Sequence, residues 1–492
     1  MKVGEAAGLM SADASSISAE IFDKQITDYS IDSRSVGAGE LFFALSQKDY
    51  VRAGFNGEFA DGHRFIEGAF SSGAVAAVAR LDRVQGDSQL EAMKDRLLLV
   101  EDAIAALQLL AHRVYKEWGG KVVAITGSAG KTTAKELTAH VLKSVGHRVL
   151  KSERNYNNGL GLPLSVLKMV SGGNAPADFD LAVLEMGMSS PTHEIQRLVK
   201  ITPPDVGVEL MVAPVHLEYL GTIENIAAAK AELIEGLKPD GTAILNADDE
   251  LVMKMRDKHA GRILTFGIDN QADVMATDIN TSSLGKITFR LRTPSGEVGA
   301  MLPMTGRHNL SNALAAATVG TAFDMSAGEI AAALKSATPP KMRGEVFEFA
   351  AGFTVIDDSY NSNPKSLLHM VRTMADARSD RKRLFVIAGE MLELGPDEVA
   401  LHRQAGVEIA EAGIDTVWGV RGLGKEIVAG ANSAGLMNTR FFESSADVAA
   451  EIVSEVREGD LLLIKGSRGV ATDKVVSALK AEFALTGEDT NG

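Results

Sequence analysis

The sequence predicts an α/β fold of three domains, and three observations support this prediction. Short apolar runs alternate with longer segments of helical periodicity, which is typical of parallel sheets with crossover helices. The alternation resumes after Pro339-Pro340, which indicates a second, separate α/β layer. The length of 492 residues fits about three domains of ~150 residues each. We place boundaries near residues 118 and 339, which gives domains 1–118, 119–339 and 340–492.

The N-terminal segment has a more mixed pattern than the rest of the chain. Short strands are expected near Ile31 and at residues 41–45, and a helix over 103–115 leads into the central domain. Alternating residues at 287–291 predict strands within 273–302, with a hairpin at 294–296. The remaining strands are predicted at 122–126, 181–185, 206–212 and 243–245 of the central domain and at 353–357, 384–388, 416–420 and 461–464 of the C-terminal domain.

The composition excludes several classes of function. The chain has no cysteine, so disulfides, thiolate zinc sites and a cysteine nucleophile are absent. The net charge of -15 argues against non-specific nucleic-acid binding, which depends on Lys and Arg neutralising phosphates. No stretch approaches the ~18 apolar residues of a membrane span, and the N-terminus lacks the apolar core of a signal peptide. We therefore expect a cytoplasmic protein without membrane insertion.

The most informative motif is the run at residues 125–133, which follows an apolar stretch. A strand that turns through glycines into a helix directs backbone N–H groups and a helix N-terminus at one point, where phosphate binds. Only two residues separate the glycines of this loop, whereas the usual P-loop has four. A helix-capping turn is the alternative, but the preceding strand and the Lys-Thr-Thr continuation favour a nucleotide site. Its residues are Gly127, Ser128, Ala129, Gly130, Lys131, Thr132 and Thr133.

Three side chains have expected roles around phosphate and Mg²⁺. In such a loop Lys131 reaches the outer phosphates and the Thr132 hydroxyl ligates Mg²⁺. Glu185 ends the apolar run at 181–185, so we expect it at the carboxyl end of a strand, where ligands bind in open α/β sheets. There a carboxylate can hold Mg²⁺ beside the loop. The alternative is a solvated glutamate at a strand end.

His216 and Lys230 are further candidates. His216 follows an apolar strand and can reach the same edge of the sheet, although a lone histidine is more often structural. The helical pattern at 223–237 follows Thr222, a residue type that caps helices, and places Lys230 as the only charge in an apolar stripe. Snorkelling of the lysine stem is one explanation. The other is a buried amine with a lowered pKa, which is available for chemistry.

Four further segments combine polar side chains with turn residues. Residues 155–163 hold three asparagines beside glycines and a proline, a composition that turn chemistry also explains. A helix that begins near Gly306 carries amides and a cation that can face a base or a phosphate. Residues 343–345 and 357–364 lie beyond the predicted boundary. If they reach back, a nucleotide would be clamped between two domains.

Taken in order, these motifs resemble those of the Mur ligases of peptidoglycan synthesis, ATP-dependent amide-forming enzymes with a short GxxGKTT loop. The resemblance extends from about residue 28 to about residue 475. It is closest to the branch that carries DDSYN.NP and MLELG, and the DNPR string of the branch that adds the preceding residue is missing. The motifs are DSRS from Asp32, DGHRF from Asp61, NYNNGLGLP from Asn155, EMG from Glu185, APVHLE from Ala213, AKAE from Ala229, GRHNLSNALAA from Gly306, DDSYNSNP from Asp357 and MLELG from Met391.

The resemblance implies a central P-loop ATPase domain with a parallel sheet, a C-terminal Rossmann-like domain and a smaller mixed α/β N-terminal domain for the uridine nucleotide. It implies ATP and Mg²⁺ as cofactors. Lys230 matches the family lysine that is carbamylated, which converts an amine into an anionic metal ligand. The implied residues are Lys131, Lys230, His216 and Glu185 for catalysis; Thr132, Glu185, His216 and carbamylated Lys230 for the metal; Asn309, Asn312, Arg343 and Asp358, besides the loop, for ATP; and Ser33, Arg34, Asn155, Asn158 and Asn361 for substrate.

The implied reaction joins D-alanyl-D-alanine to UDP-N-acetylmuramoyl-tripeptide after ATP has phosphorylated the tripeptide carboxylate. The incoming amine must lose a proton, and His308 and Glu390 are candidates for its base. The chain is expected to be a monomer. The third peptide residue, diaminopimelate or lysine, stays open. The alternatives are another amide ligase such as a folylpolyglutamate synthase, which the N-terminal motifs disfavour, and a nucleotide-binding regulator, for which the metal-binding residues would be superfluous.

The chain departs from the family pattern at several positions. Leu210 stands where Thr is usual, and Met211 stands where Asn is usual, before the histidine loop. His193 replaces a common glycine, and Glu390 replaces the usual Asp before MLELG. These departures bear on substrate detail and rate, not on the class of reaction.

Overall fold

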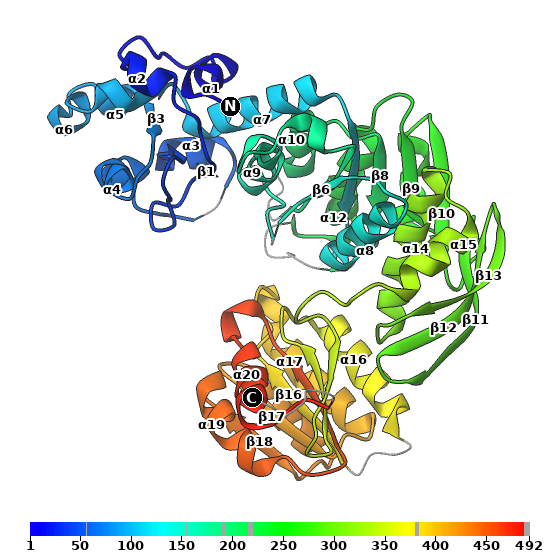
Figure 1. Ribbon diagram of the computed structural model, residues 1–492. Helices are drawn as coiled ribbons and strands as arrows, with labels where there is room; N and C mark the ends of the chain where they lie inside the picture. The colour runs from blue at the N-terminus through cyan, green and yellow to red at the C-terminus, as the bar shows by residue number, and fades with distance from the viewer. Residues whose placement is uncertain (56, 154, 189–192, 215–219, 379–382, 487–492) are drawn as a thin grey trace. The chain divides into compact units, whose positions relative to one another are not determined.

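The structure is a computed structural model that describes residues 1–492 except 56, 154, 189–192, 215–219, 379–382 and 487–492 (Figure 1). Its described part contains three β-sheets. By its contacts the chain forms two compact units, residues 1–212 with 224–265 and residues 213–223 with 266–492. The boundaries near residues 118 and 339 stay predictions.

The N-terminal sheet is parallel, with the strand order β1-β2-β3-β4. Every residue of β3 is buried, so both faces of this strand are covered, as is usual in parallel sheets. The strands expected near Ile31 and at 41–45 are confirmed as β1 and β2. The elements are α1 (Val3–Met10), α2 (Ala19–Phe22), β1 (Tyr29–Ser30), β2 (Leu41–Phe43), α3 (Gln47–Arg52), α4 (Ile66–Ser71), β3 (Ala76–Arg80), α5 (Leu81–Val84), α6 (Ser88–Glu91) and β4 (Leu97–Val100).

The central sheet has nine strands in the order β13-β12-β11-β10-β9-β8-β5-β7-β6. The strand that leads into the glycine loop, β5, therefore lies between β7 and β8, and it pairs in parallel with both. The four predicted central strands are confirmed, although β8 ends at Glu209 and not at residue 212. The elements of the first unit are α7 (Ala103–Trp118), β5 (Lys121–Thr126), α8 (Lys131–Ser144), β6 (Val149–Lys151), α9 (Gly161–Leu167), β7 (Leu181–Glu185), α10 (Glu194–Ile201), β8 (Val206–Glu209), α12 (Ile223–Glu235), β9 (Thr242–Asn246), α13 (Glu250–Met253) and β10 (Arg262–Gly267).

The antiparallel end of the central sheet is confirmed as predicted. Strand β12 pairs with β11 on one side and with β13 on the other, and the turn at 294–295 joins β12 to β13. Buried residues of β12 alternate with partly or fully exposed ones, which is the pattern of a sheet with one solvated face. These elements are β11 (Val274–Ser283), β12 (Lys286–Thr293), β13 (Gly296–Leu302), α14 (Arg307–Ala322) and α15 (Ala327–Lys335).

The C-terminal sheet is a doubly wound sheet with a core on each face. Its order is β14-β15-β19-β16-β17-β18, and all pairs are parallel except β14 with β15. Val386 and Leu463 belong to one core, whereas their neighbours Phe385 and Leu462 belong to the other. The elements are β14 (Glu345–Glu348), β15 (Thr354–Asp358), α16 (Pro364–Asp376), β16 (Arg383–Gly389), α17 (Glu398–Glu411), β17 (Thr416–Val420), α18 (Gly424–Ser433), β18 (Thr439–Phe442), α19 (Ser445–Glu455), β19 (Asp460–Lys465) and α20 (Asp473–Glu482).

Close packing of α17 on α18 depends on Gly406. A Cβ atom at this position would lie 2.0 Å from the Ile427 carbonyl oxygen. We expect Gly406→Ala to push the two helices apart and to destabilise the C-terminal domain by about 2 kcal/mol, because overpacking a core costs roughly 1–3 kcal/mol. Thermal unfolding measures this effect. The control is Gly68→Ala in α4, where a Cβ meets no atom within 4 Å; an unchanged Tm for Gly406→Ala would contradict the prediction.

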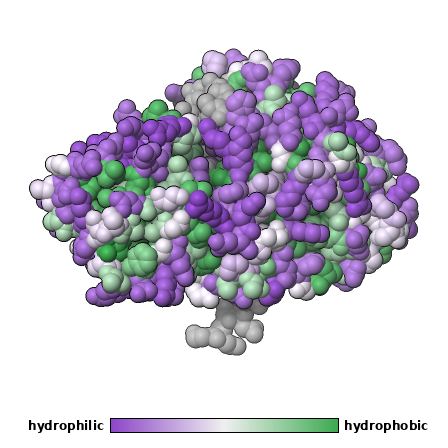
Figure 2. Space-filling model, turned by 90° about the horizontal axis from the view of Figure 1, so that it is seen from above, coloured by the Kyte–Doolittle hydropathy of each residue, from purple (hydrophilic) through white to green (hydrophobic). Residues whose placement is uncertain are grey.

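The surface shown in Figure 2 is mostly hydrophilic, with apolar residues in scattered patches. Within the described ranges, no helix combines the length and the apolar composition that a bilayer crossing requires.

Candidate active site

The loop between β5 and α8 has a backbone path that requires its two glycines. Gly127 has a φ of 153°, and a Cβ atom there would lie 2.8 Å from Leu210 Cβ. Gly130 has a φ of 85° and is the N-cap of α8. The Lys131 amine donates a hydrogen bond to the Gly127 carbonyl oxygen at 2.8 Å. Gly130 therefore caps the helix, as the alternative interpretation held, and the same geometry points the first N–H groups of α8 at one place, which is where anions bind.

Glu185 lies beside this loop because it is the register partner of Ile125 on β5. Its side chain is buried and accepts two hydrogen bonds, from Thr132 Oγ1 at 2.9 Å and from Asn157 Nδ2 at 2.8 Å. A Cβ atom at Gly187 would lie 2.8 Å from Asn157 Cγ, so the glycine of the EMG motif leaves room for this amide. Asn157 was not among the residues predicted for the site, although the NYNN motif contains it.

The oxygens of Thr132 and Glu185 suit a magnesium ion. A hydroxyl and a carboxylate are hard oxygen ligands, and their 2.9 Å separation lets both face one cation. Among the described residues, no group of three or more His, Cys, Asp or Glu side chains could hold a metal alone.

Lys230 is buried on α12, with 2% of its surface exposed. Burial lowers the pKa of Lys230 to about 7; the Glu209 charge opposes this shift and the Lys131 charge adds to it. The neutral amine is therefore well populated at neutral pH. The burial of Ile226, Leu233 and Leu237 agrees with the predicted apolar stripe in which Lys230 is the charged residue. Glu232, which lies off this stripe, is buried too, and its Oε1 lies 2.5 Å from His193 Nδ1. His193 has a φ of 53°, a conformation that explains why glycine is common at this position.

Glu209 is a second residue of this region that was not predicted from the sequence. It ends β8, and its register partner on β5 is Thr126, which directly precedes the loop. The side chain has no exposed surface, and among the described residues neither carboxylate oxygen has a hydrogen-bond partner. Burial raises the pKa of Glu209 to about 7, whereas the charges of Lys230 and Lys131 act in the opposite direction. The available signal was a glutamate inside the apolar run at 206–212.

The other predicted residues of the first unit have varied surroundings. Arg34 is exposed and forms a two-point ion pair with Asp32, through Nε at 2.9 Å and Nη2 at 2.7 Å. Asn155 is exposed, and Ser33 precedes Arg34 in the same bend region. Asn158 Oδ1 accepts from the backbone N–H groups of Leu160 and Gly161, so it supports the start of α9. His216 lies outside the described residues.

The predicted residues of the second unit belong to α14 and to the start of the C-terminal domain. Asn309 and Asn312 are buried on α14, and Asn309 Nδ2 donates to the Thr305 carbonyl at 2.8 Å. The Arg343 guanidinium stacks 4.1 Å from the centre of the Tyr360 ring. Two more predicted residues meet Lys465, whose amine lies 2.5 Å from Asp358 Oδ2 and donates to the Asn361 carbonyl at 2.9 Å.

The two candidate bases for the incoming amine have different surroundings. Burial, with the charges of His369 and Lys465, lowers the pKa of His308 to about 3, so its imidazole holds a proton only weakly at neutral pH. Glu390 Oε1 accepts a hydrogen bond from the Leu423 N–H at 2.9 Å.

Replacing Glu185 tests the magnesium assignment. We expect Glu185→Gln to weaken Mg²⁺-dependent ADP binding at least about 10-fold, because the variant loses the anionic ligand while its shape is kept. Calorimetric titration with ADP across a range of Mg²⁺ concentrations measures the effect. Glu224→Gln, an exposed position on α12, is the control. Equal Mg²⁺ dependence in the two variants would exclude Glu185 as a ligand.

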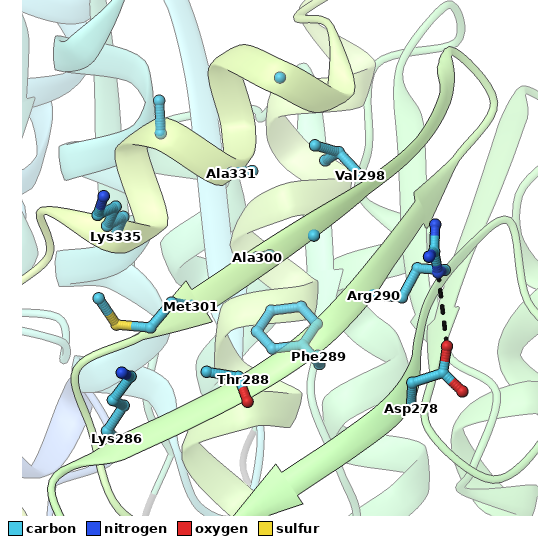
Figure 3. Close-up of a pocket in the computed structure, with 13 residues that line it drawn as sticks. Asp278, Lys286, Thr288, Phe289, Arg290, Val298, Ala300, Met301, Ala331 and Lys335 are labelled. Carbon is cyan, nitrogen blue, oxygen red and sulfur yellow. Dashed lines mark ion pairs between the residues drawn. The ribbon is translucent and has the colours of Figure 1, made fainter.

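A groove of about 730 Å³ runs along β12, β13 and α15 (Figure 3). It is lined by Lys286, Lys335 and Arg290, and Arg290 Nε lies 3.4 Å from Asp278 Oδ2. None of the predicted site residues that the structure describes lines this groove.

Comparison with known proteins identifies relatives along most of the chain. Residues 125–320 match the family model of the Mur ligase middle domain, and residues 342–468 match that of the Mur ligase, glutamate ligase domain. The UDP-N-acetylmuramoyl-tripeptide–D-alanyl-D-alanine ligase of Bacillus subtilis is 33% identical over 449 residues, which cover 91% of this chain and 92% of the relative.

Solved structures agree with the sequence relatives. A crystal structure of MurF from Acinetobacter baumannii matches with a TM-score of 0.80 and 27% identity, over 93% of this chain and 94% of that one. MurF from Thermotoga maritima, in complex with ADP, matches with a TM-score of 0.75 and 26% identity, over 95% and 99% of the two chains. These matches confirm the predicted three-domain α/β fold. The chain belongs to the Mur ligase family, in the group of UDP-N-acetylmuramoyl-tripeptide–D-alanyl-D-alanine ligases.

Proposed function

We propose that this protein joins D-alanyl-D-alanine to UDP-N-acetylmuramoyl-tripeptide in an ATP-dependent reaction that releases ADP and phosphate. The observation that carries the proposal is the arrangement of Lys131, Thr132 and Glu185 at one edge of the central sheet. It supplies a cation, a hydroxyl and a carboxylate where a nucleotide phosphate and Mg²⁺ would lie. The name of the Bacillus subtilis relative supports the choice of substrates.

The proposed mechanism begins with attack of the tripeptide carboxylate on the γ-phosphate of ATP. A carboxylate alone is a poor acyl donor because its leaving group would be oxide, and an acyl phosphate gives phosphate instead. The Lys131 amine and the N–H groups at the start of α8 stabilise the charge that develops on the transferred phosphoryl group. The amine of D-alanyl-D-alanine then attacks the acyl carbon and phosphate leaves.

Thr132 and Glu185 would hold Mg²⁺, which neutralises phosphate charge when bound. We assign His216 and Lys230, as its carbamate, to the same metal site on the basis of the family motif. Asn309, Asn312, Arg343 and Asp358 are assigned to ATP. The proposed substrate residues are Ser33, Arg34, Asn155, Asn158 and Asn361.

We further propose that the protein acts as a cytoplasmic monomer with no nucleic-acid partner. The support for this is that both substrates are small molecules and that the net charge is -15, which disfavours binding to nucleic-acid phosphates. Light scattering after size exclusion tests the oligomeric state.

Phosphate release tests the reaction. We expect turnover only when ATP, UDP-N-acetylmuramoyl-tripeptide and D-alanyl-D-alanine are all present, and the product gains the mass of the dipeptide less water. Tripeptides that end in diaminopimelate or in lysine are compared in parallel. Hydrolysis of ATP that is indifferent to both substrates would favour a nucleotide-binding regulator. Turnover with a folate and glutamate would favour a folylpolyglutamate synthase.

A further inference from the structure

The carboxylate of Glu209 is an anomaly in the core of the first unit. It has no exposed surface, and within the ranges that the structure describes both oxygens are without hydrogen-bond partners. A buried carboxylate without a partner is strongly unfavourable, since burial removes its hydration without compensation. Such a group calls for an explanation in the chemistry of the site.

Lys230 is the complementary group. It is buried on α12, which packs on β8: a Cβ atom at Gly207 would lie 3.4 Å from Leu233 Cγ. Lys230 lies one helical turn before Leu233, and Glu209 lies two residues after Gly207 on the same face of β8, so both side chains belong to the space between this helix and this strand. Within the described part of the chain, no hydrogen bond or ion pair joins the Glu209 carboxylate to the Lys230 amine.

Two other charged groups border this space. Lys131, at the start of α8, lowers the pKa of both residues, and Asp249, before α13, raises that of Glu209. Both carboxylate oxygens of Asp249 already have hydrogen-bond partners. Its Oδ1 accepts from the Leu251 N–H, and its Oδ2 accepts from the Val212 N–H. The Lys131 amine is bound to the Gly127 carbonyl. Lys230 is thus the neighbour whose chemistry can supply the partner that Glu209 lacks.

A carboxyl group attached to the Lys230 amine would add oxygen atoms in the space between α12 and β8. The C–N and C–O bonds place the carbamate oxygens roughly 2.2 Å beyond Nζ. We propose that Glu209 is a positioning residue that binds the carbamate of Lys230 by a hydrogen bond and so fixes its orientation. This inference rests on the proposed function, in which carbamylated Lys230 is a metal ligand.

The carbamylation step balances within the pair. The neutral Lys230 amine attacks carbon dioxide, the N–C bond forms, and one C=O electron pair moves to oxygen. The proton released from the nitrogen passes to the Glu209 carboxylate. The sum is Lys–NH₂ + CO₂ + Glu–COO⁻ giving Lys–NH–COO⁻ + Glu–COOH. Glu209 then carries the O–H that donates to the carbamate, so two like charges do not meet in the buried site.

Carbon-13 NMR of the full-length protein in [¹³C]bicarbonate detects a carbamate without any assay of activity. We expect a carbamate resonance in the wild type that is absent from Lys230→Met. Glu209→Met, an apolar side chain of similar length, should reduce carbamate occupancy at least fivefold. Glu209→Gln is the matched control and should keep at least half of it, because its amide can donate the same hydrogen bond.

The outcomes separate this inference from the proposed function. Full carbamate occupancy in Glu209→Met, or loss in Glu209→Gln as well, would overturn the role of Glu209 while leaving the ligase proposal intact. A wild type without a carbamate resonance would overturn both the role of Glu209 and that of the Lys230 carbamate. The phosphate-release assay would then test the ligase reaction independently of the carbamate. Glu209→Leu replaces Glu209→Met if that variant does not fold. A purely structural carboxylate would change Tm in these variants without changing the resonance.

Discussion

Lys131→Ala is expected to lower kcat for ATP-dependent ligation by at least about 10³-fold, because loss of a fixed charge or donor at the reacting group costs roughly 10²–10³-fold and Lys131 also positions the nucleotide. Its amine sits 2.8 Å from the Gly127 carbonyl, within the loop where the outer phosphates would lie. Phosphate release with both substrates present measures the loss.

Lys143→Ala is the control for this prediction. Lys143 lies on the same helix, α8, and is exposed near its C-terminal end. Its replacement should leave kcat within about twofold, because surface charges remote from the site contribute little. If Lys131→Ala also kept kcat within that range, the loop would not be the phosphate site.

Lys230→Ala is expected to lower kcat by about 10²-fold or more, with a raised Mg²⁺ requirement. The variant removes the buried amine that the proposed carbamate needs, and a metal site that loses a ligand loses both affinity and orientation of the phosphates. Initial rates across Mg²⁺ concentrations give both quantities.

Two further substitutions at this position separate charge from carbamylation. Lys230→Arg keeps a cation but cannot form the carbamate, so we expect it to be as inactive as the alanine variant. Lys230→Met keeps the apolar stem and reports on packing alone. Full activity in Lys230→Ala would refute the carbamate role.

Much of the fold follows from local pattern. Runs such as 122–125 and 181–184 are apolar throughout because their strands are buried on both faces, and this allowed the strands to be predicted. Strand β14 was not predicted because its residues are half-buried or exposed at the edge of the sheet and form no apolar run. The end of β8 was placed too far along the chain because residues after Glu209 are apolar as well.

Site residues could be predicted where their neighbours in sequence mark them. They could not be predicted where their position depends on the order of strands in the sheet. The loop and Glu185 are marked by their own neighbours in sequence. The proximity of Glu209 to the glycine loop requires β8 to lie beside β5, an order that no local pattern encodes. The choice among adjacent asparagines was equally hidden, because it depends on which amide faces Glu185, and that residue is Asn157.

The central claim is that the tripeptide carboxylate attacks ATP directly. It is tested most directly with substrate labelled with ¹⁸O in its terminal carboxylate. Attack on the γ-phosphate leaves one carboxylate oxygen on the phosphoryl group, so the phosphate released after amide formation should carry one ¹⁸O atom for each two-fold labelled carboxylate consumed. Phosphate without ¹⁸O, formed while the labelled pentapeptide accumulates, would contradict the account.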